Sequence, residues 1–144
     1  MAVAAWQRAR VPRGFSELWC EELASVAGLA GLRRRLRSAT TGSPTVARPE
    51  QEHWAERLVL VADELTSNAL RHGGAPVSTA LSRVGNQWLV SVSDYSPDVP
   101  PAPAEGRDPG LGGLGLYLIA DLAVRHGWFA HRGMKTVWAV VAAE

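Results

Sequence analysis

The stretch "VADELTSNALRHGG" at residues 61–74 limits the fold of this chain more than any other. Pro49 suits the first turn of a helix and Gly73-Gly74 suit its end, so we predict a helix from about residue 49 to Arg71. Its apolar residues recur at three- and four-residue steps and predict one buried face: Leu58, Val61, Ala62, Leu65 and Ala69.

A row of polar residues runs beside that apolar face. Glu64, Asn68 and His72 follow one another at four-residue steps, which places them about 40° apart around a helix. A solvated flank is one interpretation. The other is a ligand site, because a carboxylate can orient or deprotonate a hydroxyl and an amide oxygen is a hard ligand that suits magnesium.

Composition excludes several classes of protein. The 144 residues, 47% of them hydrophobic, suffice for one compact domain, and a net charge of +1 is not typical of a general polyanion binder. The single cysteine, Cys20, excludes an internal disulfide and a cysteine zinc site. Without a signal-peptide pattern or an apolar run of membrane-spanning length, we predict a soluble, cytoplasmic protein with no membrane contact.

The remaining segments predict an α+β sandwich with a mainly antiparallel sheet. Leucine spacing predicts helix over 16–38, with Gly28 and Gly31 as places where it could divide. Two hairpins are predicted, one from strands 77–84 and 87–94 around Gly85-Asn86, the other over 128–143 around Arg132-Gly133. Between them lie a proline-rich segment, 96–109, and a glycine cluster that leads into an apolar helix, 110–127.

Two further features are compatible with a nucleotide. Asp94 ends an apolar strand, where it is either a turn former or an acceptor for a donor such as the adenine amino group. The glycines of "GLGGLG", 110–115, offer backbone N–H groups before a helix, which suits phosphate. That segment also matches the dinucleotide fingerprint G-x-G-x-x-G. The fingerprint requires a preceding strand and a later acid, and here a proline-rich loop and His131-Arg132 stand in those places, so we exclude it.

Taken in order, these segments resemble the GHKL ATPases, the superfamily of gyrase and histidine-kinase ATP domains. "ELTSNALRHG" resembles the N box, "VSVSD" the G1 box, "GGLGL" the G2 box, and "GMKTVWAVV" the strand with the adenine-side threonine. Within the superfamily the chain is most similar to actinobacterial anti-sigma-factor serine/threonine kinases. The resemblance implies the Bergerat fold, a two-layer sandwich with helices on one face of a mixed, mainly antiparallel sheet. It divides the chain into an arm or edge strand, 1–15, and a single histidine-kinase-like ATP-binding domain, 16–144.

The resemblance also implies roles for individual residues. Glu64 would be the general base or water-orienting carboxylate, and Asn68 would ligate the Mg²⁺ that bridges the phosphates of ATP. Asp94 would accept from the adenine amino group with support from Thr136, often through a water molecule. The remaining nucleotide-binding positions that it implies are Arg71, His72, Gly112, Gly113, Gly115 and Leu116, with an equally weighted structural role for His72.

The implied function is a kinase that binds a sigma factor and phosphorylates an anti-anti-sigma protein of the STAS type. The alternative is an ATP-binding partner-switching module with little or no turnover. That alternative is favoured by the G1 box, usually D-x-G-x-G, which here reads Asp94-Tyr95-Ser96-Pro97. Intact Glu64 favours the kinase.

Two surface features leave other partners to be weighed. The arginines of "LRRRLR", 32–37, spread around a helix, so we favour a solvated surface or an acidic partner over direct contact with nucleic acid. Trp6 and Trp19 are either core residues or part of a homodimer or partner surface.

Overall fold

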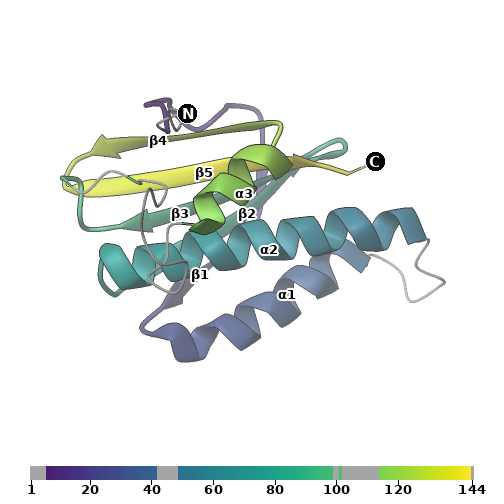
Figure 1. Ribbon diagram of the computed structural model, residues 1–144, viewed down its shortest axis with the longest axis horizontal. Helices are drawn as coiled ribbons and strands as arrows, with labels where there is room; N and C mark the ends of the chain where they lie inside the picture. The colour runs from purple at the N-terminus through teal and green to yellow at the C-terminus, as the bar shows by residue number, and fades with distance from the viewer. Residues whose placement is uncertain (1–5, 42–48, 99–100, 102–113, 144) are drawn as a thin grey trace.

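The computed structural model describes residues 6–41, 49–98, 101 and 114–143. A five-stranded sheet in the order β1-β2-β3-β5-β4, with every neighbouring pair antiparallel, forms one layer of the protein (Figure 1). The elements follow one another as β1 (Ser16–Leu23), a short 3₁₀ helix (Val26–Gly28), α1 (Leu29–Thr41), α2 (Pro49–His72), β2 (Val77–Val84), β3 (Gln87–Asp94), α3 (Leu114–Leu122), β4 (Arg125–His131) and β5 (Met134–Ala142).

The three α-helices cover one face of the sheet (Figure 1), which confirms the predicted α+β sandwich. Side chains alternate between the faces of a strand. On β3, Trp88, Val90 and Val92 are therefore directed to the helical layer, where all three are buried in the main core. The ring of Trp54 on α2 lies 5.2 Å from that of Trp88, which fixes the helix against the strand.

Helix α2 and both hairpins agree closely with the sequence prediction. The helix ends at His72, and Gly74 after it has a φ of 77°, a left-handed conformation that favours glycine. The turns at Gly85-Asn86 and Arg132-Gly133 join β2 to β3 and β4 to β5, although β4 begins at Arg125 rather than at residue 128.

The predicted helix over 16–38 is wrong over 16–25, and 26–28 form a short 3₁₀ helix before α1. Residues 16–23 form edge strand β1, which pairs with β2 from Ser16–Arg83 to Leu23–Val77, and α1 begins only at Leu29. Most of β1 is exposed, so its few apolar side chains give no two-residue alternation that would identify a strand. Leu29, Leu32 and Leu36, which lie on one face of α1, are buried.

The described part of the N-terminal segment lies against the last hairpin and the second face of the sheet. The backbone of Arg8 forms a parallel bridge with Trp128, and the indole N–H of Trp128 donates to the carbonyl of Trp6 at 3.0 Å. Further along, Val11 and Phe15 pack on the small core cluster of Leu89, Trp138 and Val140. Trp6 is buried, in agreement with its interpretation as a core residue, whereas Trp19 is half-buried beneath the guanidinium of Arg35.

His126 under this segment makes folding sensitive to pH. Its ring lies 4.4 Å from that of Trp6, and burial lowers the pKa of His126. The unfolded chain then binds a proton near its ordinary pKa of about 6.5 before the folded chain does, so stability is complete above that pH and decreases as the pH falls through it. We expect the melting temperature to fall less on acidification in His126→Gln than in the native protein. Equal falls in the native protein and the variant would contradict this role of His126.

No helix in the part of the chain that the structure describes has the length and apolar character needed to cross a membrane.

Candidate active site

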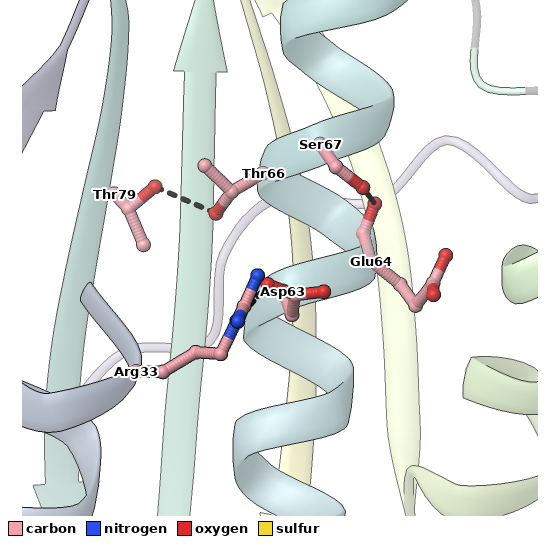
Figure 2. Close-up of polar contacts among 6 residues, drawn as sticks. All are labelled: Arg33, Asp63, Glu64, Thr66, Ser67 and Thr79. Carbon is pink, nitrogen blue, oxygen red and sulfur yellow. Dashed lines mark hydrogen bonds and ion pairs between the residues drawn. The ribbon is translucent and has the colours of Figure 1, made fainter. Parts of the chain in front are cut away.

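Helix α2 presents Glu64 on the side of the helix that faces α3. Val61 and Leu65 beside it are buried, whereas Glu64 and Asn68 are half-buried and His72 is exposed. Figure 2 shows the Glu64 side chain pointing away from Arg33 and Asp63. Among the described residues the Glu64 carboxylate has no hydrogen-bond or ion-pair partner.

The neighbouring acid, Asp63, has a structural contact instead. The guanidinium of Arg33 on α1 donates to its Oδ1 at 2.8 Å (Figure 2). Two consecutive carboxylates on one helix therefore differ in their contacts. Asp63 joins α2 to α1, and the side chain of Glu64 points to the other side of the helix. Sequence reasoning did not identify Asp63, because its partner lies 30 residues away on another helix.

The arginine run on α1 is engaged within the protein. Arg33, Arg35 and Arg37 approach acids on other elements, and their partners are Asp63, Glu21 and Glu56. These contacts favour the structural interpretation of the run over contact with nucleic acid.

The Arg33–Asp63 contact gives a stability prediction. We expect Arg33→Ala to lower the free energy of unfolding by about 0.5–1 kcal/mol, because a half-exposed ion pair with good geometry contributes little more than that. Arg34→Ala, at the exposed next position, should change it by less than about 0.5 kcal/mol. Urea unfolding followed by tryptophan fluorescence measures both. Equal losses in the two variants would contradict a specific role for the pair.

A buried hydroxyl pair fixes α2 to the sheet. Thr66 and Thr79 lie 2.9 Å apart through their hydroxyl oxygens, one from α2 and the other from β2 (Figure 2). Both side chains are buried, so each hydroxyl satisfies the other in the core. This contact joins α2 to β2 two residues after Glu64.

Asp94 lies where β3 ends beneath the C-terminal end of α2. It is 0% exposed, and its Oδ1 accepts from the backbone N–H of Ser96 at 2.8 Å. The Ser96 hydroxyl donates to the carbonyl of Gly73 at 2.7 Å. A Cβ added to Gly73 would lie 2.4 Å from Oδ2 of Asp94, so only glycine permits this approach. The ends of α2 and β3 are thereby held together.

The second oxygen of Asp94 faces a lysine. Lys135 Nζ lies 3.4 Å from Oδ2, and the two residues are directly paired in the β3–β5 register. Lys135 is 4% exposed, so the ion pair is buried. Within the described residues Oδ2 is enclosed yet accepts no hydrogen bond, which is unusual for a buried carboxylate oxygen.

Thr136, the residue after Lys135, projects from the other face of the sheet. Its hydroxyl is 2.8 Å from that of Ser93, and the two residues face each other across β3 and β5. Because successive side chains alternate, Ser93 and Thr136 project from the face opposite to Asp94 and Lys135. The residue beside Asp94 is therefore Lys135, one position earlier in the strand, and Thr136 does not support that carboxylate by direct contact.

The remaining predicted positions divide between described and undescribed parts of the chain. Arg71 and His72 are exposed at the end of α2. Gly115 lies in the first turn of α3, and the side chain of Leu116 is buried in the core. Gly112 and Gly113 lie outside the described residues, as does most of the proline-rich segment 96–109.

A comparison with known families identifies the family of this chain. The sequence model of the histidine kinase-like ATPase domain matches residues 24–141, which is most of the chain. The protein therefore belongs to the histidine kinase-like ATPase domain family. No curated protein matches the chain.

The side chains present fit a magnesium–nucleotide complex. The buried Oδ2 of Asp94 accepts no hydrogen bond from the described residues and suits an amino donor such as that of adenine. Glu64 and Asn68 offer a carboxylate and an amide one helical turn apart. No group of three or more His, Cys, Asp or Glu side chains in the described ranges could hold a metal alone, so phosphate oxygens would have to complete a magnesium site.

Proposed function

We propose that this protein is an ATP-binding regulatory kinase of the anti-sigma type, which transfers a phosphoryl group to a serine or threonine of an anti-anti-sigma partner. The family supports the use of ATP. The observation on which the transfer step depends is the contrast between the carboxylate of Asp63, which is ion-paired to Arg33, and that of Glu64, which has no partner among the described residues.

In the proposed reaction, Glu64 accepts the proton of the partner hydroxyl. That oxygen forms a bond to the γ-phosphorus of ATP, the bond from this phosphorus to the β–γ bridging oxygen breaks, and ADP leaves. Asn68 would hold Mg²⁺, which neutralises phosphate charge when bound. Asp94 would orient the adenine ring of ATP. Arg71 and His72, at the exposed end of α2, would position the phosphates.

A partner-switching module with little turnover is the second candidate. Its support lies in the segment after β3, where Ser96 takes part in two hydrogen bonds that tie it to Asp94 and Gly73. A backbone held in this way has less freedom to approach the adenine ring than a segment with the two glycines usual in the G1 box. A radiolabelled-phosphate assay with a candidate partner distinguishes the two, because only the kinase labels the partner.

Nucleotide binding is the first test of either function. We expect ATP with Mg²⁺, at about 100 times its dissociation constant, to stabilise the protein by about 2.7 kcal/mol, which raises the melting temperature by several degrees. Asn68→Ala should lose most of the magnesium-dependent part of this shift. His53→Ala, at an exposed position of the same helix, is the matched control. Millimolar ATP that leaves the native melting temperature unchanged would contradict the proposal.

A further inference from the structure

Lys135 is the only lysine in the chain, and it is buried. The other fourteen of the fifteen basic residues are arginines, most of them at exposed or half-buried positions. A buried ammonium group loses its hydration, and this cost is tolerated only where a partner compensates it. Asp94 provides that partner at 3.4 Å. Because the basic residues of this chain are otherwise all arginine, composition alone does not explain why position 135 is a lysine.

The ion pair presents a hydrogen-bond donor beside an acceptor on one face of the sheet. Asp94 and Lys135 are direct neighbours across β3 and β5, so both side chains project toward the helical layer. One oxygen of Asp94 is occupied by the N–H of Ser96, and Oδ2 accepts no hydrogen bond from the described residues. Nζ, with three protons, can donate to more than one acceptor.

We infer that Lys135 is a second base-reading residue, which donates to ring nitrogen N1 of adenine while Asp94 accepts from the neighbouring 6-amino group. This inference rests on the proposed binding of ATP. Adenine presents an amino donor beside a ring-nitrogen acceptor. Asp94 and Lys135 present the complementary arrangement, an acceptor beside a donor. A charged donor makes a stronger hydrogen bond than a neutral hydroxyl, so Lys135 would contribute to selectivity directly.

Nucleotide analogues test the contact without altering the protein. 1-Deaza-ATP lacks the N1 acceptor, and 7-deaza-ATP, which retains N1 and lacks N7, is the matched control. In calorimetry with Mg²⁺ we expect the dissociation constant of 1-deaza-ATP to exceed that of ATP by about tenfold or more, the effect of losing one charge-assisted hydrogen bond to the ligand. 7-Deaza-ATP should bind like ATP. Equal affinity for ATP and 1-deaza-ATP would overturn the inference.

The single lysine also provides a spectroscopic readout. Protein grown with ¹³Cε-labelled lysine gives one lysine signal, which belongs to Lys135. ATP and 7-deaza-ATP at saturation should shift that signal by similar amounts, and saturating 1-deaza-ATP should leave it near its ligand-free position. A common shift with all three ligands, or no shift with any, would show that Lys135 does not contact N1.

A variant identifies the donor. Lys135→Met, once its fold has been verified by circular dichroism, should bind ATP and 1-deaza-ATP with the same affinity. If the variant still binds ATP more tightly than 1-deaza-ATP, another group contacts N1 and the inference is overturned. If the variant does not fold, the lysine signal of the native protein decides the question. If ATP itself does not bind the native protein, the proposed function fails and the inference fails with it. Equal binding of ATP and its 1-deaza analogue removes only the role of Lys135.

Discussion

Lys135→Met is expected to lower the free energy of unfolding by about 3–5 kcal/mol, a large fraction of the stability of a domain of this size. The substitution leaves the Asp94 carboxylate 0% exposed with no opposite charge beside it. The desolvation cost of a buried charge is much larger than the lost attraction alone. Urea unfolding followed by tryptophan fluorescence gives the change in free energy.

Two controls distinguish this effect from simple loss of packing. The double variant Asp94→Asn with Lys135→Met has no buried charge, and we expect it to recover most of the stability lost in either single variant. The Arg37–Glu56 pair has the same 3.4 Å separation but is exposed, so Arg37→Ala should cost less than about 1 kcal/mol. Additive losses at Asp94 and Lys135 would show that the two charges do not compensate each other.

The sequence predicted the elements around the site better than the contacts between them. The period of the apolar residues identified α2, and the turn residues Gly85-Asn86 and Arg132-Gly133 identified two hairpins, because both signals are local. Edge strand β1 was not identified. A strand that buries little of its surface does not require regular alternation of apolar and polar residues. The spacing of the leucines in and around it is typical of a helix.

The register of β5 shows why the candidate site was predicted only in part. Asp94 was identified by its place at the end of an apolar strand, and the structure buries it against the end of α2. The side chain beside it depends on how β5 is aligned with β3. A shift of one residue exchanges every side chain between the faces, and that alignment cannot be read from either strand alone. The structure places Lys135 next to Asp94 and directs Thr136 to the other face.

The difference between Asp63 and Glu64 leads to a prediction about catalysis. Both are acids on consecutive positions of α2, but Arg33 on α1 contacts only the first. No pattern in the sequence of α2 distinguishes them, because the distinction comes from the packing of a second helix. If Glu64 is the base, removal of its charge should reduce phosphoryl transfer and leave nucleotide binding unchanged, whereas removal of the Asp63 charge should reduce stability alone.

We therefore expect Glu64→Gln to lower the rate of phosphoryl transfer to the partner by about 10²–10⁴-fold, the range typical for loss of a general base. ATP affinity should remain within about twofold of native, since the Glu64 carboxylate acts on the attacking hydroxyl and not on the adenine ring or the metal. Asp63→Asn is the matched control: it also removes one carboxylate from α2, and it should retain transfer while it loses the Arg33 contact. Single-turnover assays with radiolabelled ATP measure the transfer rate, and calorimetry measures affinity. Native transfer in Glu64→Gln would remove Glu64 from the mechanism. A native protein that binds ATP and transfers nothing, with a partner whose binding responds to ATP, would identify the chain as the partner-switching module.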